Sequence, residues 1–598
     1  MLGGAWLAVD PRARRAALPG GLASSGEGLA RFGVTVGNAA LTLADYKWTL
    51  LGTSKEERPD EYKAALREAN QRAARRLLAV CLSHGGIYTK FGQSIGNLSY
   101  ALPAEFTETL APLQDRAQAM PRELVASTVE AELGGAPLSS VFSEFDLEPV
   151  AAASLAQVHR AVLRGSGETV AVKLQYPYLG AQTEGDLSTL RLLAETVGYW
   201  FPDFGYSWLV PEFENNMALE LDFVQEARNA ERLARQFRAR HDVLVPAIRW
   251  EHTTPRMLIM QFIAGIKVND VARLEAAGVN PLAVARTVSS VFGDMIHVHG
   301  FVHCDPHAGN LMVLPASSAS ASAYASAARW LAGLGYAALA ALALAGSGGL
   351  LAPGSGAALG AAAGSVGLVG LSGALALAAP LPQQQPYKLV VLDHGMYRRL
   401  DPPFRHAYCQ LWRAMLLRDE ALGLDAVRQL GVPAKHYQAI SLIFAFRTPV
   451  SQQQTGARME TAERDKLRVQ YKDVTAGDVN VFLQGLPRDL LFVLRSTNIV
   501  RSINLSLGGT TRLRFKVMGE SAVRGMLVRN PSPEQIERAI QPGLPIDGAR
   551  VINKPVASEL VDAETVTWRQ AFEMWRLRTF LELVDRSWGV LASLVKLL

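Results

Sequence analysis

Two short polar segments carry side chains suited to phosphoryl transfer. The first holds Asp305 and Asn310, five positions apart, and the second holds Asp393, which is followed by His394 and Gly395. Phosphoryl transfer needs a carboxylate near the acceptor hydroxyl and oxygen ligands for the divalent ions that bridge the nucleotide phosphates. Asp305 can supply the first group, and Asn310 with Asp393 can supply the second. Either segment alone is a weak signal, because an Asp five residues before an Asn is common by chance.

The order of the surrounding residues strengthens this interpretation. The first segment begins at His303 and keeps the H-x-D-x-x-x-x-N spacing of a protein-kinase catalytic loop. Upstream, Lys173 ends the run Val-Ala-Val-Lys, a strand pattern whose lysine grips the α- and β-phosphates in kinases. Glu226 lies in an acidic helical segment between the lysine and the loop, and it is the predicted partner of Lys173. Lys173 alone would indicate a strand-end lysine reaching into solvent, but its place in this order favours a nucleotide site.

The segment where a kinase carries its glycine-rich loop is rich in alanine instead. It contains Ala151, Ala152, Ala153, Ser154 and Gln157, and we predict that these residues contact the nucleotide. Glycine tolerates positive φ and lets the backbone approach phosphates. Alanine still allows a close approach but restricts the dihedral angles, so we expect a stiffer loop that holds nucleotide differently.

A second unusual motif is Lys-Phe-Gly-Gln, in which Lys90 and Gln93 project from one face of a predicted helix. This motif, the Ala-rich loop, the Glu220-x-Asp222 pair and the His-Cys-Asp-Pro-His run together resemble the UbiB / aarF-domain atypical kinases. Within that family the chain most resembles the aarF-domain-containing kinase one type. It departs from the family pattern at Ala308, where proline usually follows the second histidine of the loop. This departure removes no ligand.

The resemblance implies a fold and a set of roles. The expected fold class is α+β, an atypical protein-kinase-like two-lobe fold with a helical N-terminal extension and a helical C-terminal region. ATP and Mg²⁺ would bind between the lobes, and Lys90 and Gln93 would face Glu220 and Asp222 as a latch that blocks protein substrates. The resemblance also links the chain to coenzyme Q synthesis or membrane lipid homeostasis, with an unidentified small-molecule or lipid acceptor.

The chain of 598 residues is too long for one compact core, so several units are expected. We predict a transit or disordered segment, a helical Lys-x-Gly-Gln extension, a kinase-like N-lobe, a C-lobe with a low-complexity insertion at 315–386, and a C-terminal helical region; these cover residues 1–40, 41–122, 123–262, 263–450 and 451–598. Strands are expected around 154–163, 169–174, 243–250 and 256–262 in the N-lobe, and strands 311–314 and 388–392 should pair beside the metal site.

The insertion is rich in Ala, Gly and Ser, and it separates Asn310 from Asp393. Segments 330–352 and 356–379 are each about long enough to span a bilayer, which needs roughly 20 apolar residues. Both ends are fixed at one site, so only a hairpin within 330–379 could enter a membrane. We favour a loop, because Gly and Ala give a weak insertion drive. The amphipathic tail 565–598 is expected to pack on the kinase lobe or lie on a membrane surface.

Bulk composition limits the partners and the compartment. A net charge of +5 makes no strong case for nucleic acid, but it is compatible with peripheral association with anionic membranes. Three distant cysteines, Cys81, Cys304 and Cys409, imply no disulfide framework. A zinc site at the catalytic loop is disfavoured, because no second Cys/His pair lies nearby.

The Arg-rich, acid-poor N-terminus indicates a transit segment or an ordinary ragged end. We favour the mitochondrion over the chloroplast, because the resembled type is mitochondrial.

Two classes of function remain open on these residues. The first is an atypical kinase or ATPase that acts on a small molecule or lipid, with Asp305 as the acceptor base. The second is a nucleotide-gated scaffold or lipid-binding pseudokinase without significant catalysis. An intact Asp305 favours the enzyme, whereas a blocking extension and a stiff Ala-rich loop favour the scaffold. A conventional protein kinase is disfavoured by the absent glycine-rich loop.

Overall fold

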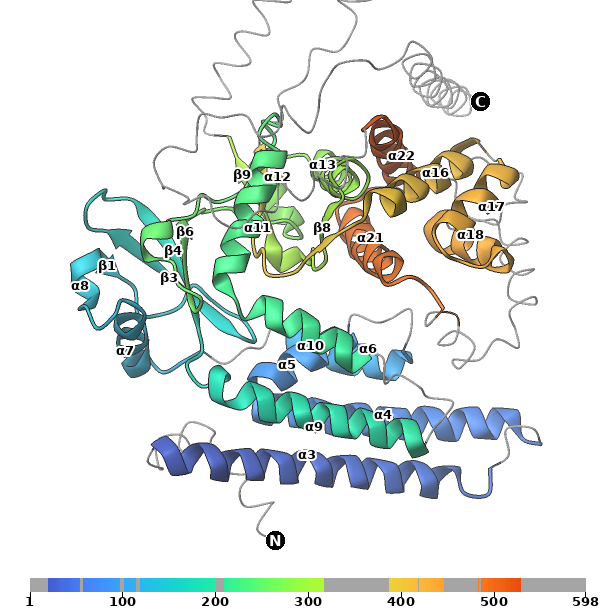
Figure 1. Cartoon of the computed structure of the whole chain (residues 1–598), viewed down its shortest axis with the longest axis horizontal. Helices are drawn as coiled ribbons and strands as arrows, with labels where there is room; N and C mark the ends of the chain where they lie inside the picture. Colours follow the sequence, from blue (N-terminus) through green and yellow to red (C-terminus); the bar gives the residue numbers. More distant parts are fainter. Residues whose placement is uncertain are drawn as a thin grey trace, which may run out of the picture.

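The computed structural model describes residues 20–53, 57–96, 102–114, 119–200, 209–316, 387–417, 419–445, 482 and 485–528. The predicted membrane hairpin at 330–379 and the predicted amphipathic tail at 565–598 lie outside these residues. The described part confirms an α+β arrangement in which a small sheet-containing lobe and a larger helical lobe are flanked by a layer of N-terminal helices (Figure 1). Within the described residues, no helix is long and apolar enough to cross a membrane.

The small lobe is built on a five-stranded antiparallel sheet in the order β1-β3-β4-β6, with β2 added beside β3. Its central strand β4 is buried on both sides of Lys173, whose neighbours across the sheet are Val158 and Leu258. Helix α11 packs against β6 and crosses the lobe (Figure 1). The elements of this lobe are α7 (Arg122–Glu132), α8 (Leu138–Val141), β1 (Phe142–Phe145), β2 (Ala151–Ala152), β3 (Ala156–Leu163), β4 (Thr169–Gln175), α9 (Leu179–Trp200), α10 (Leu209–Glu220), α11 (Phe223–Gln236), η3 (Trp250–His252) and β6 (Met257–Gln261).

A second sheet brings together the two polar segments that the insertion separates. Its order is β5-β10-β9-β7, and β9 (Leu311–Pro315) pairs antiparallel with β10 (Tyr387–Val391), as the sequence predicts. Asn310 and Asp393 are 83 positions apart in the sequence, but they lie at the same end of this strand pair. The predicted strand 243–250 is divided between the two sheets: β5 (Val243–Leu244) pairs with β10, whereas Ile248 forms an isolated antiparallel bridge with Met260 of β6 in the small lobe.

The large lobe is mostly helical, and its core forms where α16, α21 and α22 pack around Trp412 and Phe515. Asn280 caps α13, and Pro281 occupies its first turn, so the local sequence sets where this helix begins. The elements are β7 (Ile266–Lys267), α12 (Val271–Ala276), α13 (Pro281–Asp294), the π-helical turn η4 (Met295–His299), β8 (Phe301–His303), η5 (Ala308–Asn310), β11 (Tyr397–Arg399), α16 (Pro402–Leu417), α17 (Glu420–Gln429), η6 (Ala434–His436), α18 (Tyr437–Ala445), α21 (Arg488–Ser506) and α22 (Thr511–Leu527).

The N-terminal helices form a layer on one side of the two lobes (Figure 1). Helix α4 ends before Gly85, whose φ of 67° favours glycine, and α5 begins at Gly86 as a separate helix. Gly92 on α5 allows a close approach, because a Cβ there would lie 2.4 Å from the Leu113 side chain. The layer consists of α3 (Gly20–Leu50), α4 (Pro59–His84), α5 (Gly86–Gly96), α6 (Ala104–Leu110) and η1 (Ala111–Gln114).

The transit segment expected within residues 1–40 stays a prediction, but the alternative of a disordered segment is wrong from Gly20 onward. Helix α3 begins there, and its Arg31 side chain is buried against Asp186 of α9, with Nε donating to Oδ1 at 3.0 Å. Arg31 Nη1 also donates to the His84 carbonyl at 2.9 Å, and Thr35 Oγ1 lies 3.0 Å from His84 Nε2. Arginines that suggest a transit peptide by composition therefore include one that fixes α3 to the fold.

We expect Arg31→Met to loosen α3. Removing one member of a buried ion pair leaves Asp186 without its partner, which costs about 3–5 kcal/mol. Amide hydrogen exchange in α3 measures this directly, and we expect on the order of 100-fold less protection there than in the wild type. Arg122→Met removes an exposed ion pair with Glu148 and serves as the control. Unchanged protection of α3 in Arg31→Met would contradict the anchoring role.

Candidate active site

The Lys173–Glu226 pair lies where strand β4 and helix α11 meet. Lys173 Nζ donates to Glu226 Oε1 at 2.6 Å and to Oε2 at 2.8 Å, and the Phe223 ring centroid lies 5.0 Å from the ammonium. Asp222 fixes the start of α11, since its side chain accepts hydrogen bonds from the backbone of Val224 and Gln225. Burial lowers the pKa of Lys173, but Asp393 and Glu226 outweigh it and raise that pKa above its usual value. The lysine is therefore a fixed cation.

The turn after β10 places Asp393 beside this pair. Its Oδ2 lies 3.5 Å from Lys173 Nζ, and its Oδ1 accepts from the Gly395 backbone at 3.1 Å. Asp393 has φ of 49°, a left-handed conformation that is uncommon outside glycine and costs free energy. The His394 backbone N–H donates to Glu226 Oε1 at 3.2 Å, which ties this turn to α11. Partial burial raises the pKa of Asp393, but Lys173 and Lys90 lower it by more, so the carboxylate is ionised.

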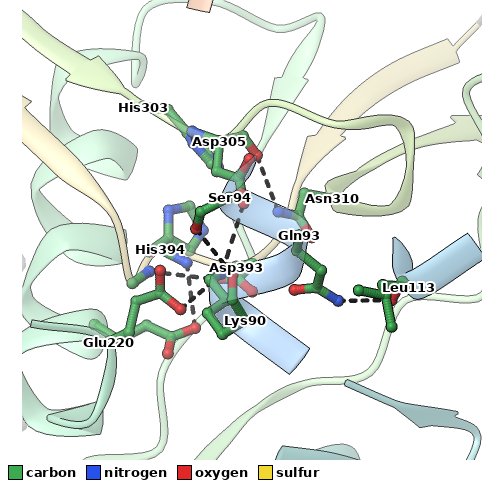
Figure 2. Close-up of polar contacts among 12 residues, drawn as sticks. Lys90, Gln93, Ser94, Leu113, Glu220, His303, Asp305, Asn310, Asp393 and His394 are labelled. Carbon is green, nitrogen blue, oxygen red and sulfur yellow. Dashed lines mark hydrogen bonds and ion pairs between the residues drawn. The ribbon is translucent and has the colours of Figure 1, made fainter. Parts of the chain in front are cut away.

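Asp305 and Asn310 lie on the loop between β8 and β9. His303 Nδ1 accepts from the Asp305 backbone at 3.1 Å, and Asn310 Nδ2 donates to the Asp305 carbonyl at 3.1 Å (Figure 2). The Asn310 carbonyl accepts from the Leu392 backbone at 2.8 Å, so the loop and the Asp393 turn are connected directly. The amide of Asn310 is thus oriented by its nitrogen, which leaves its side-chain oxygen as the atom able to bind a cation.

The Lys90 side chain extends from α5 and lies between the carboxylates of Glu220 and Asp305 (Figure 2). Its Nζ lies 2.7 Å from Glu220 Oε2 and 3.8 Å from Asp305 Oδ2. Burial raises the pKa of Glu220, and Lys90 only partly offsets that rise. The other oxygen of Glu220, Oε1, is buried and accepts no hydrogen bond from a described residue. Glu220, Lys90 and Asp305 thus form a charged bridge from the N-terminal layer to the catalytic loop.

Two residues predicted to share this latch have different contacts. Gln93 Nε2 donates to the Leu113 carbonyl at 2.9 Å, which joins α5 to η1 (Figure 2). Asp222 caps α11, and its carboxylate bonds to that helix's first backbone amides. Of the four residues predicted to form a latch, Lys90 and Glu220 are in contact, whereas Gln93 and Asp222 hold the supporting helices in place.

The predicted nucleotide loop contains a tight turn between β2 and β3. Ala151 and Ala152 are strand residues, Ala153 N–H donates to the Ala156 carbonyl at 2.7 Å, and Ser154 is buried. The side chain of Gln157 points to structural partners: its Oε1 accepts from the Met120 backbone at 2.6 Å, and its Nε2 lies 2.7 Å from His159 Nε2. Both polar ends of the Gln157 side chain are thus bonded within the lobe, and its predicted contact with nucleotide stays a prediction.

Arg495 is a site residue that sequence analysis missed. It lies on α21, and its Nη2 donates to Asp305 Oδ1 at 3.2 Å. The next residue, Ser496, donates to the His303 carbonyl at 3.1 Å, so α21 holds the catalytic loop at two points. Burial raises the pKa of Asp305, but Arg495 and Lys90 outweigh it and keep that pKa below its usual value. Arg495 and Asp305 are 190 positions apart, so no local sequence pattern could predict this contact.

The charges of the site fit a divalent cation. Three cations, Lys90, Lys173 and Arg495, face four carboxylates, which are those of Glu220, Glu226, Asp305 and Asp393. Among the described residues, no group of three or more His, Cys, Asp or Glu forms a complete metal cage. Mg²⁺ commonly binds through one or two protein oxygens together with substrate phosphates and water. Asp393 and Asn310 provide this kind of partial ligand set.

Comparison with known proteins agrees with this geometry. Residues 112–323 match the family model of the ABC1 atypical kinase-like domain. AarF domain-containing protein kinase 1 of Xenopus tropicalis is 31% identical over 482 residues, which cover 80% of this chain and 79% of that protein. The Mus musculus protein of the same name is 32% identical over 479 residues, covering 79% of this chain and 78% of that one. The chain belongs to the ABC1/aarF atypical kinase family.

Two further similarities add less to this family assignment. The ABC1/aarF protein called probable serine/threonine-protein kinase abkD, from Dictyostelium discoideum, is 31% identical over 471 residues, but the chain spans only 58% of its length. The solved complex of Rv3197 with erythromycin from Mycobacterium tuberculosis covers 78% of this chain at 20% identity, with a TM-score of 0.42. This structural similarity is too low to bear on ligands. The family assignment makes the chain kinase-like and leaves its acceptor open.

Proposed function

We propose that this protein is an atypical kinase or ATPase that binds Mg-ATP between its two lobes and acts on a small-molecule or lipid-linked acceptor. The observation that carries the proposal is that Lys173 Nζ lies within 3.5 Å of a carboxylate oxygen of Glu226 and of Asp393, beside the loop that holds Asp305. Lys173 would bind the α- and β-phosphates, and Glu226 would orient it. The backbone of the Ala-rich loop would contact the nucleotide at Ala151, Ala152, Ala153 and Ser154.

Asn310 and Asp393 would hold magnesium, which when bound neutralises charge on the bridging phosphate oxygens. Asp305 would orient the acceptor hydroxyl and take its proton. In the present arrangement both oxygens of Asp305 face cations, since Arg495 lies at Oδ1 and Lys90 at Oδ2. Lys90 and Arg495 therefore flank the position that an acceptor hydroxyl would take at this carboxylate. This position supports the proposal that Lys90 is a latch.

The setting we propose is mitochondrial lipid or prenylquinone homeostasis, with peripheral association with a membrane. This part follows from the resemblance to the aarF-domain-containing kinase one type, and the chloroplast is the alternative compartment. Localisation of the full chain by fluorescence microscopy, and the quinone content of cells that lack it, test this setting separately from the enzymatic proposal.

A nucleotide-gated scaffold is the second candidate, and the double occupation of Asp305 is the observation that favours it. Release of γ-phosphate from ATP by the purified full chain, with magnesium and with a chelator, separates the two candidates. We expect magnesium-dependent release. No release at any nucleotide concentration, together with co-purified lipid, would support the scaffold.

Lys90→Met is expected to raise ATP turnover, because it frees Asp305 Oδ2 and breaks the bridge to Glu220. Coupling between two sites is typically worth 1–3 kcal/mol, so we expect an increase of about 5-fold or more. Steady-state phosphate release measures the effect. Lys63→Met changes an exposed lysine on α4 and is the matched control. A lower rate in Lys90→Met than in this control would show that Lys90 serves catalysis and not inhibition.

A further inference from the structure

Helix α3 turns its polar side chains inward and its apolar side chains outward. Its two buried residues, Arg31 and Thr35, are both polar. Asp45 bonds to Arg72 and Arg76 of α4, and Tyr46 donates to Asn70 at 2.6 Å. No α3 residue belongs to a hydrophobic cluster of the described chain. A surface helix of a globular protein normally has the opposite arrangement.

The outward side of α3 forms a continuous apolar strip. Leu29 and Leu51 are 73% and 76% exposed, and Trp48 is 81% exposed. At about 1.5 Å per residue, the strip from Leu29 to Leu51 is roughly 33 Å long. Figure 1 shows α3 along the edge of the molecule, with α9 and α4 on one side of it only. We call this strip the outer face of α3, and its large residues are Leu29, Phe32, Leu41, Trp48 and Leu51.

Helix α9 adds three exposed apolar side chains beside this strip, among exposed charged residues that include Arg191 and Glu195. Glu27 bonds to Gln182 and Arg31 bonds to Asp186, so the two helices run parallel with a constant offset along these contacts. The same offset places Tyr199, which is 81% exposed, within about one turn of the level of Trp48. Eight of the fourteen exposed large hydrophobic residues in the described part of the chain lie on α3, just after it, or on α9. This concentration marks an interaction surface and not scattered exposure.

The chemistry of this surface identifies its partner. Among the exposed residues of α3, the only charged one is Lys47, which lies beside Trp48. Tryptophan and tyrosine favour the level of lipid headgroups, and lysine favours anionic lipid. The polar inner contacts keep α3 from rotating to bury its apolar side. We propose that the outer face of α3 lies on the surface of a lipid bilayer, with α3 parallel to the membrane plane.

This inference gives a location to the membrane association included in the proposed function, and it does not depend on ATP turnover. The docking face is distant in sequence from every residue assigned to the nucleotide site. Replacing its residues should therefore leave the magnesium-dependent thermal stabilisation by ATP unchanged. That measurement, made on the same variants, keeps a failure of the membrane proposal distinct from a failure of the kinase proposal.

Flotation with vesicles of phosphatidylcholine and phosphatidylglycerol tests the proposal on the full chain. The variant with Leu29, Leu41, Trp48 and Leu51 all changed to Glu should lose most of the binding seen in the wild type. The matched control changes Leu124, Leu282 and Leu505 to Glu; these are exposed leucines on α7, α13 and α21, and it should float like the wild type. Equal flotation of the α3 variant and the wild type would overturn the proposal. So would a wild-type dimer that the α3 variant makes monomeric, since the partner would then be a second copy.

A site-specific label reports on α3 even if another segment binds lipid. The three native cysteines are buried, so a cysteine introduced as Trp48→Cys can be labelled selectively with an environment-sensitive fluorophore. Vesicles should shift its emission to shorter wavelength, while the same label at Leu124→Cys should not respond. An unchanged spectrum at position 48 on protein that floats would overturn the proposal, because binding would then occur elsewhere.

Discussion

Asp305→Asn is expected to lower ATP turnover by about 10²–10⁴-fold while Mg-ATP still binds. Asparagine keeps the shape of the side chain, and the backbone contacts of this loop with His303 and Asn310 do not involve the carboxylate. The variant loses the oxygen that accepts the proton of the acceptor, but it retains the groups assigned to the phosphates. Single-turnover phosphate release gives the rate, and thermal unfolding with Mg-ATP gives the binding.

The control for this variant is Asp489→Asn, which removes a carboxylate paired with Arg398 at 2.7 Å on the same helix as Arg495. It should retain turnover close to that of the wild type. Equal rates in Asp305→Asn and the wild type would contradict the assigned role of Asp305. If the wild type itself shows no ATP turnover, the variant has no activity to lose, and this result would favour the scaffold.

Asp393→Asn is expected to have a larger effect, because it removes both a metal ligand and a charge. Groups aimed at charge that develops in the transition state contribute about 10²–10³-fold each, and the ion neutralises more than one oxygen. We therefore expect phosphate release to fall by at least about 10³-fold. Lys173 would also lose one of its two carboxylate neighbours, so its binding to the nucleotide phosphates should weaken as well. Rapid-quench measurement of phosphate release checks this result.

The same experiment with a chelator provides the reference for Asp393→Asn. Wild-type protein without magnesium should resemble the variant with magnesium, because both lack the occupied metal site. Phosphate release that is unchanged in Asp393→Asn would contradict the proposed mechanism outright. A moderate loss that higher magnesium restores would instead show that Asn310 and the phosphates hold the ion with little help from Asp393.

The local sequence was sufficient to predict the elements that carry the site. The Val-Ala-Val-Lys run that ends at Lys173 predicted β4, and the order of motifs predicted that Asn310 and Asp393 would meet across 83 positions. The pairing of β9 with β10 confirms this second prediction. These features depend on periodicity and on fixed motif spacing, both of which are readable within short windows.

Contacts between distant elements could not be predicted in this way. Arg495 reaches Asp305 only because α21 packs against β8. Gln157 and Asp222 have side chains suited to a ligand, but the backbone amides of Met120, Val224 and Gln225 engage them first. The composition of residues 1–40 suggested a transit segment, whereas Arg31 becomes structural through a partner 155 positions away. In each case tertiary packing decides which partner a polar side chain takes.

Thermal unfolding with and without Mg-ATP, on the wild type and Asp393→Asn in parallel, tests the central claim most directly. A ligand at about 100 times its dissociation constant stabilises the folded state by roughly 2.7 kcal/mol. We predict that the wild type unfolds at a higher temperature with Mg-ATP, that this shift requires magnesium, and that Asp393→Asn lacks it. No shift in the wild type at any nucleotide concentration, or an equal shift in both proteins, would contradict a magnesium–nucleotide site at Asp393.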